Sequence, residues 1–196
     1  MSIQTRRERE RVERERLIVT AARELAESEG WDAVTTRRLA AEIEYSQPVL
    51  YSHFKGKDAI MAAVAVEGFA ELATEMREAR EAVAGAREAL AAVGEAYTAF
   101  ARRRPALYDA MFTHTVPLPF ATPEAPAALW EAFGELVAAV TPIATADDDP
   151  GLLTETYWAG LHGLVTLMRS RRLPEKAHDQ RLRLLTEHFA AARGET

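Results

Sequence analysis

The chain has 196 residues, which is long enough to bury a substantial core as one large domain or two small ones. Apolar residues make up 48% and charged residues 28%, which excludes wholesale disorder, and the absence of cysteine excludes disulfides, thiolate metal sites and cysteine nucleophiles. The net charge of −6 argues against a nucleic-acid partner, but residues 1–58 hold eleven basic and eleven acidic side chains, so all the excess acid lies in the later residues.

The first residues, MSIQTRRERERVERERL, are charged where a signal peptide needs an apolar segment. No apolar run approaches the roughly 20 residues that a membrane-spanning helix needs. We therefore expect a cytoplasmic protein with no membrane partner.

An all-α fold is expected because no window shows the two-residue alternation of a half-buried strand, while Ala, Leu, Glu and Arg dominate. Apolar side chains at helical spacing predict a first helix over about 6–29, and Gly30 is a natural C-terminal stop. Two short helices are expected over 36–43 and 47–52, and a long fourth helix begins near Lys57.

Proline and aspartate residues mark helix boundaries in the rest of the chain. Pro105 breaks one helix, and Asp149 can cap another that has Pro150 at its first position. The further helices are expected over 86–103, 105–113, 123–140, 150–172 and 175–192.

The two short helices have recognisable ends. Thr35 is expected to cap the first of them, and Ser46 the second, with the Ser46 hydroxyl accepting from the N–H of Val49. Pro48 suits the first helical turn, where its missing N–H costs no hydrogen bond. Leu50 and Phe54 can anchor the inner face, which leaves four side chains facing elsewhere: Gln47, Val49, Tyr51 and His53.

Two short helices joined by a tight turn and braced by a longer helix make a helix-turn-helix, whose second helix must fit the major groove of DNA. The stretch LIVTAARELAESEGWDAVTTRRLAAEIEYSQPVLYSHFKGKDAI resembles the DNA-binding domain of TetR/AcrR-type bacterial transcriptional regulators over roughly residues 10–60. It departs from that family at Glu44-Tyr45, where glycine-valine is usual, at Pro48, where a small residue is usual, and at Val49, where threonine is common. A left-handed Glu44 would cost on the order of 1 kcal/mol.

The resemblance implies roles for individual side chains. Gln47 and Val49 face base edges, and Val49 can contact a thymine methyl group. Five others hold phosphates and set the register on the duplex: Thr36, Arg37, Tyr51, His53 and Lys57. The implied DNA-binding set is Thr36, Arg37, Ser46, Gln47, Val49, Tyr51, His53 and Lys57.

Alternatives remain open for several of these residues. Tyr51 could pack on the first helix, His53 could bond to a backbone carbonyl, and Arg38 could face DNA in place of Arg37. The N-terminal arginines could enter a flanking minor groove, or form a solvated helix with paired charges such as Glu10–Arg14.

Later in the chain, Trp158, His162 and Gly163 resemble the tryptophan-histidine-glycine (WHG) signature of one TetR C-terminal subclass. The last two long helices are expected to form the four-helix interface of a homodimer, because one short reading helix contacts too few base pairs for useful specificity. Gly160 and Gly163 would let a partner helix approach, or would serve packing within the chain.

The family also implies a small-molecule pocket. Aromatic and sulfur-bearing side chains could line it with a few polar groups, although each could also be ordinary core. The predicted ligand-binding set is Tyr97, Phe100, Tyr108, Met111, Phe112, Trp130, Trp158 and His162.

These observations predict a helix-turn-helix DNA-binding domain over residues 1–56 and a larger helical ligand-binding and dimerisation domain over 57–196. The function expected is a ligand-responsive repressor that binds a palindromic operator in double-stranded DNA as a homodimer, under a small apolar effector, without cofactor or metal. An activator stays possible.

The other classes considered are a protein-binding adaptor and a helical-bundle enzyme. The single Glu-x-x-His copy, Glu175 to His178, follows Pro174 on a helix start expected to be exposed, and a di-iron site needs two such copies. We therefore expect no catalytic activity.

Overall fold

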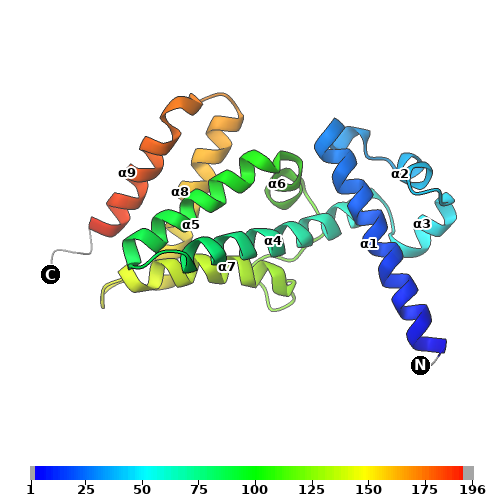
Figure 1. Cartoon of the computed structure of the whole chain (residues 1–196), viewed down its shortest axis with the longest axis horizontal. Coiled ribbons are helices and arrows are strands. Elements are labelled where there is room, and N and C mark those ends of the chain that lie inside the picture. Colours follow the sequence, from blue (N-terminus) through cyan, green and yellow to red (C-terminus); the bar gives the residue numbers. More distant parts are fainter. Residues whose placement is uncertain (1–2, 192–196) are drawn as a thin grey trace. The chain divides into compact units, whose positions relative to one another are not determined.

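The computed structural model describes residues 3–191, which form α-helices joined by turns and three short 3-10 helices (Figure 1). No strand occurs in that range, which confirms the all-α prediction, and no helix within it is long and apolar enough to cross a membrane. The α-helices are α1 Ile3–Glu29, α2 Thr36–Glu42, α3 Gln47–His53, α4 Lys57–Glu81, α5 Ala86–Arg103, α6 Pro105–Phe112, α7 Ala127–Val140, α8 Pro150–Arg169 and α9 His178–Ala191.

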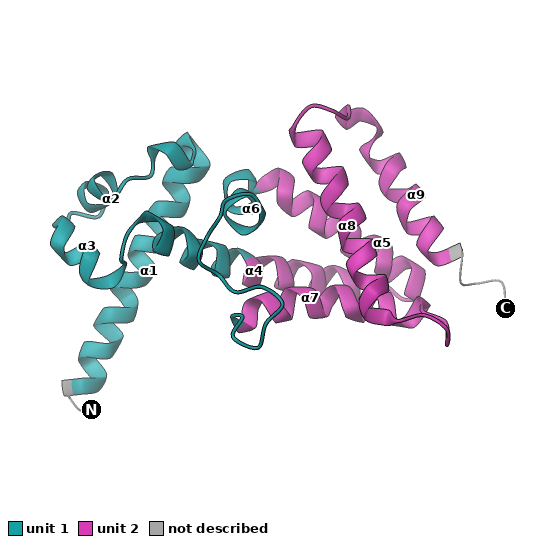
Figure 2. Ribbon diagram, turned by 180° about the vertical axis from the view of Figure 1, so that it is seen from behind, with its two compact units in different colours: residues 1–68, 104–126 teal, residues 69–103, 127–196 magenta. Residues whose placement is uncertain are grey.

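The described residues form two compact units (Figure 2). Unit 1 comprises residues 3–68 and 104–126, and unit 2 comprises residues 69–103 and 127–191. Helix α4 contributes its first turns to unit 1 and the remainder to unit 2. The domain boundary predicted from the sequence, after residue 56, separates expected functions, whereas the two units are defined by contacts. That functional boundary stays a prediction.

Local capping explains most helix ends. The Thr35 side chain accepts from the N–H of Arg38 at 3.2 Å, and Asp149 accepts from the first N–H groups of α8, both as predicted. The Ser46 prediction is wrong in detail. Ser46 occupies the N-cap position, but its hydroxyl makes no capping bond, and its backbone carbonyl receives the N–H of Val49 at 3.0 Å.

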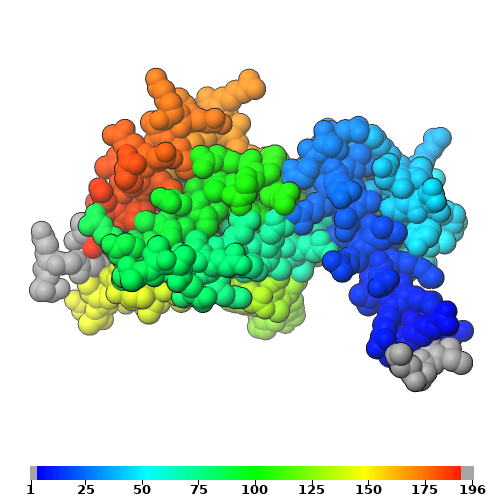
Figure 3. All heavy atoms as spheres, in the orientation of Figure 1, coloured from blue at the N-terminus to red at the C-terminus, as the bar shows by residue number. Residues whose placement is uncertain are grey.

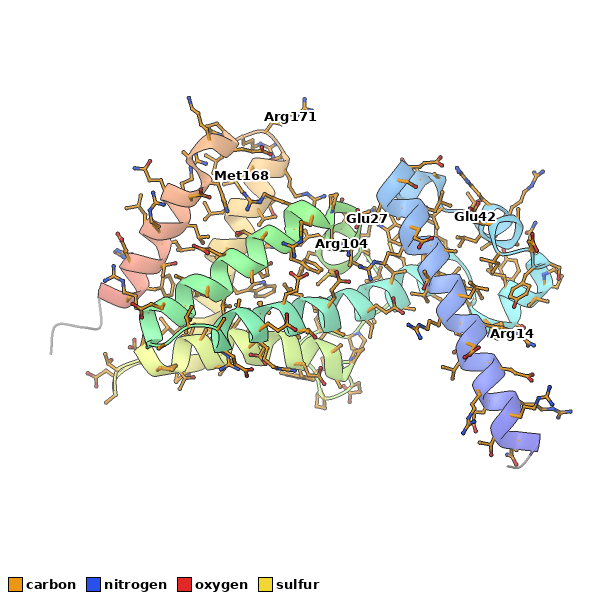
Figure 4. The ribbon with its side chains drawn as sticks, viewed as in Figure 1. Arg14, Glu27, Glu42, Arg104, Met168 and Arg171 are labelled. Atoms are coloured by element: carbon orange, nitrogen blue, oxygen red, sulfur yellow. The ribbon has the colours of Figure 1, made fainter. Side chains whose placement is uncertain are left out.

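In unit 1, α6 docks on the end of α1 through polar contacts. The Glu27 carboxylate accepts from the backbone N–H of Ala106 at 3.2 Å and of Leu107 at 3.0 Å, two donors that a helix start leaves unpaired. Figure 4 shows Glu27 on the side of α1 near Arg104, where α6 begins. The buried Trp31 indole donates to the Ala106 carbonyl at 2.8 Å. Two residues near the end of α1 therefore hold the first turn of α6.

In unit 2, α5 is the central helix and packs against α7, α8 and α9. Tyr157 of α8 is fully buried, and its hydroxyl donates to the Leu90 carbonyl at 2.9 Å. Burial raises the pKa of Tyr157 to about 12, so the hydroxyl stays protonated and remains a donor. Gly94 makes room for it, because a Cβ there would lie 2.5 Å from the Tyr157 hydroxyl.

The expectation that the start of the last helix is exposed is wrong for His178. This residue is 3% exposed, and its Nε2 lies 3.1 Å from the Thr98 hydroxyl of α5. The 3-10 turn Glu175–Ala177 precedes α9 and brings His178 onto α5. Among the described residues no group of three or more His, Asp or Glu could hold a metal.

Gly94→Ala is expected to lower the free energy of unfolding by about 1–3 kcal/mol, because the new methyl group displaces the Tyr157 hydroxyl. Urea unfolding followed by circular dichroism measures this change. Gly134→Ala in α7 is the matched control, since its Cβ would meet nothing within 4 Å, and we expect unchanged or slightly higher stability. Equal effects of the two substitutions would contradict the close contact.

Candidate nucleic-acid interface

Helix α3 buries one side and exposes the other. Leu50 is fully buried and anchors the helix, with Phe54 half-buried just after its end. Gln47 is exposed, Val49 is 36% exposed and Tyr51 is 52% exposed. A seven-residue helix therefore presents an amide, a branched apolar side chain and a phenol to solvent, which are groups able to contact base edges and phosphates.

The turn before α3 is strained. Glu44 has φ 57°, the left-handed conformation that favours glycine. The N–H of Tyr45 bonds the Ala40 carbonyl at 2.8 Å, which ends α2 in a tight turn. The family's usual glycine at position 44 therefore has a physical reason, and this chain forms the same turn with glutamate.

Tyr51 and Thr36 meet between the two short helices. The Thr36 hydroxyl lies 3.3 Å from the Tyr51 hydroxyl, and Thr36 begins α2. This contact holds the phenol at the edge of α3 facing α2. Two predicted phosphate contacts are thus brought together on one exposed surface.

His53 and Lys57 have partners inside unit 1. The His53 side chain is 7% exposed, and its Nδ1 lies 3.3 Å from a Glu15 carboxylate oxygen. The Lys57 ammonium donates to the Trp31 carbonyl. Either residue would have to leave its internal partner to bind a phosphate, and their DNA contacts stay predictions.

Arg37 and Arg38 differ in their ion pairing. Arg38 forms a forked ion pair with Glu29, in which Nη1 lies 2.7 Å from Oε2, and this contact holds the pKa of Glu29 below its ordinary value. Arg37 is exposed and has no ion-pair partner among residues 3–191. Arg37 is thus the one of the two whose charge is available to a phosphate.

The first turns of α1 project beyond the other elements of unit 1 (Figure 3). Their charges pair along the helix: Arg6 with Glu10 and Arg11 with Glu15, both at 2.9 Å, and Arg14 with Glu10 at 3.9 Å. This is the pairing expected of a solvated helix.

The predicted ligand-binding residues fall in both units. In unit 2, Tyr97 of α5 joins two residues of α8: the Trp158 indole donates to the Tyr97 hydroxyl at 3.1 Å, and that hydroxyl lies 3.4 Å from Nδ1 of His162. Burial lowers the pKa of His162 and so favours the neutral imidazole. Phe100 is fully buried, whereas Trp130 is 47% exposed on α7. The other three belong to unit 1: Tyr108, Met111 and Phe112.

Sequence reasoning missed one buried charge cluster in unit 2. Glu135 of α7 is 8% exposed and accepts from Nε of Arg77 at 2.7 Å and Nε of Arg80 at 3.0 Å, both from α4. The available signal was an acid in the apolar stretch LWEAFGELVAAV, since a buried carboxylate needs a cationic partner.

Two family models match the chain. The model described as bacterial regulatory proteins, tetR family, matches residues 18–64, and the model described as tetracyclin repressor-like, C-terminal domain, matches residues 90–189. The WHG subclass stays a prediction.

Individual proteins are also similar to this chain in sequence or in structure. An uncharacterized HTH-type transcriptional regulator of Mycobacterium tuberculosis is 28% identical over 150 residues, which is 76% of this chain and 67% of that protein. A protein of unknown function from Rhodococcus sp. RHA1 has a similar structure, with TM-score 0.77, 25% identity and coverage of 92% of this chain and 95% of that one. A TetR variant from Acinetobacter baumannii AYE, solved in complex with minocycline, has TM-score 0.66, 20% identity and coverage of 91% and 97%.

Glu44→Gly is expected to raise the free energy of unfolding by about 1 kcal/mol, because glycine adopts the φ of 57° without the steric cost of a Cβ. Chemical denaturation of the purified protein measures the change. Glu42→Gly, at the last residue of α2, is the control and is expected to lower stability slightly, because no positive φ is relieved there and glycine weakens a helix. A destabilised Glu44→Gly protein would show that the glutamate side chain contributes more than the strain costs.

Proposed function

Because the chain belongs to the TetR family of bacterial transcriptional regulators, we propose that it is a repressor that binds a palindromic operator as a homodimer and is released by a small-molecule effector. The observation that carries the DNA-binding part is the exposed face of α3, held in place by the buried Leu50. A helical-bundle enzyme or an adaptor gives no reason for this set of exposed side chains.

In the proposed complex, α3 lies in the major groove. Gln47 hydrogen-bonds a base edge, and Val49 contacts a thymine methyl group. Tyr51, Thr36 and Arg37 bind phosphates and set the register of α3 on the duplex. At the start of α3, the Ser46 hydroxyl makes no capping bond and can donate to a further phosphate.

The proposed dimer interface is the outer face of α8 with the adjoining face of α9. Leu152 and Leu167 of α8 and Leu184 of α9 are large apolar side chains that stay exposed in one protomer. Gly163 supports this assignment, because a Cβ there would meet nothing within 4 Å, so packing within the chain does not require glycine. Gly160 differs, since a Cβ there would lie 2.9 Å from Leu185 of α9, and it serves intrachain packing.

The proposed effector site is built on the hydrogen-bonded residues Trp158, Tyr97 and His162 in unit 2. They supply a few polar groups in an otherwise apolar set of side chains, which is the composition of small-molecule sites. The effector must bind the DNA-competent and released conformations with different affinity, or it shifts neither population.

Selection of bound sequences from a random double-stranded DNA pool tests the proposal. Purified protein at about 0.15 M salt is expected to enrich a two-fold symmetric site, because two identical α3 helices read it. The folded variant Gln47→Ala/Tyr51→Ala is the control and is expected to enrich no such site. If both proteins enriched nothing across a panel of candidate effectors, the repressor proposal would fail and an adaptor would be favoured.

Arg37→Ala is expected to weaken operator binding and to reduce the slope of log affinity against log salt by about two, because each protomer of the dimer loses one phosphate contact. Arg38→Ala is the matched neighbour and is expected to change the slope little, since Arg38 is engaged by Glu29. Fluorescence anisotropy at four salt concentrations gives both slopes. The reverse outcome would assign the phosphate contact to Arg38.

A further inference from the structure

The last residue of α3 is held by a side chain of α1. Helices α1 and α3 lie side by side in unit 1 (Figure 1). The His53 side chain is 7% exposed, and its Nδ1 lies 3.3 Å from Oε1 of Glu15. Because an ionised carboxylate only accepts hydrogen bonds, Nδ1 must be the donor in this contact. The end of α3 therefore depends on an acid of another helix.

Glu15 is engaged from two sides. The oxygen that faces His53 also accepts from Nε of Arg11 at 2.9 Å. The Arg11 contact holds the pKa of Glu15 below its ordinary value, and His53 acts in the same direction, although partial burial opposes both. The carboxylate therefore stays charged at neutral pH and serves both donors. These three side chains, Arg11, Glu15 and His53, are called the α1 brace below.

Glu15 lies where α1 meets the core of unit 1. Ile18 and Val19, three and four residues later, lie on the same face of the helix and are buried. Arg11 lies one turn earlier and is exposed. Both Arg11 and Glu15 precede residue 18, where the matched tetR family model begins. The α1 brace therefore joins α3 to a part of α1 that lies outside the matched region.

A carboxylate beside a DNA-binding helix has an electrostatic cost. Negative charge near phosphates weakens DNA binding, and an uncharged residue at position 15 would avoid that repulsion. Among the described residues, His53 is the one residue of α3 to which Glu15 is hydrogen-bonded. The contact with His53 therefore gives a physical reason for an acid at this position, provided that the placement of α3 matters for binding.

The same geometry argues against a phosphate contact by His53. Little of its imidazole is accessible, since the side chain is 7% exposed. A phosphate at this ring would also approach the Glu15 carboxylate, and two anions repel each other. Gln47 and Val49, by contrast, are exposed on α3 and can reach DNA directly. Both facts favour a role for His53 inside unit 1.

We propose that Glu15, held in place by Arg11, and His53 are positioning residues that fix the end of α3 on α1. The α1 brace aims Gln47 and Val49 at base edges, and His53 itself does not touch a phosphate. The inference rests on the DNA binding of the proposed function and adds a determinant of its specificity. Base contacts depend on the orientation of the helix, whereas sequence-independent binding to phosphates depends mainly on charge. Loss of the α1 brace therefore lowers specificity more than general affinity for DNA.

Glu15→Ala and Glu13→Ala form a matched pair of variants. Each removes one negative charge from α1, and Glu13 is exposed, with no ion-pair partner within residues 3–191. Fluorescence anisotropy gives the dissociation constant of each protein for the selected operator and for a random duplex at one salt concentration. Circular dichroism checks that each protein is folded.

The two variants are expected to differ on the operator. Glu15→Ala should bind the operator at least about tenfold more weakly than the unmodified chain, because the contact with His53 is lost in both protomers. Its binding to the random duplex should be unchanged or slightly tighter, since a negative charge has been removed. Glu13→Ala should bind both duplexes at least as tightly as the unmodified chain.

Two amide variants of His53 separate positioning from a phosphate contact. The amide nitrogen of asparagine is as many bonds from Cα as Nδ1 of histidine, and that of glutamine as many as Nε2. His53→Asn keeps a donor facing Glu15, so its operator affinity should stay within about threefold of the unmodified chain. His53→Gln lacks that donor and should lose as much operator affinity as Glu15→Ala. The combined variant Glu15→Ala/His53→Gln should bind no more weakly than either single variant, because both remove the same contact.

The results that would overturn the inference are distinguishable from failure of the proposed function. If the unmodified chain selects no operator, the proposed function fails, and the inference fails with it. If the unmodified chain binds its operator and Glu15→Ala binds it as tightly as Glu13→Ala does, DNA binding stands and the positioning role is wrong. Equal losses of Glu15→Ala on the operator and on the random duplex would also contradict it. Tighter operator binding by His53→Gln than by His53→Asn would assign a phosphate contact to His53 instead.

Discussion

The burial of Trp31 is the interaction on which the position of helix α3 depends. Its indole donates to the Ala106 carbonyl at the start of α6, and its own carbonyl accepts from Lys57 at the start of α4. Helices α2 and α3 have seven residues each and bury few side chains, so they need bracing from other elements. Trp31, which follows α1 directly, joins three helices of unit 1 and holds the frame in which Leu50 anchors α3.

In unit 2, as in unit 1, buried polar groups join neighbouring helices. Its buried polar atoms are placed where a second helix supplies a partner: Tyr157 with the Leu90 carbonyl, and Glu135 with two arginines of α4. Burying such groups adds little net stability, but leaving one without its partner is costly. These contacts therefore favour one register of helix packing over others that would bury the same apolar area.

The two surfaces proposed to bind partners share one property, which is that intrachain packing does not account for their residues. Glu44 keeps a strained turn ahead of α3, and Gly163 leaves open space on α8 although glycine weakens a helix by about 1 kcal/mol relative to alanine. Exposed Tyr51 and Leu152 likewise contribute little to the core. The DNA binding proposed for one surface and the dimerisation proposed for the other would give these features a common explanation.

The sequence by itself determined the helices and most of their ends, because Gly30, Pro105 and the Asp149-Pro150 pair act on their immediate neighbours. It also determined the helix-turn-helix, since its signals lie within about fifty residues. Only the tertiary structure decided which side chains are engaged. His178 is buried against Thr98, 80 residues away, and Arg38 rather than Arg37 is paired with Glu29. Partners of this kind depend on how helices pack, and packing depends on side-chain shape across segments that no local pattern relates.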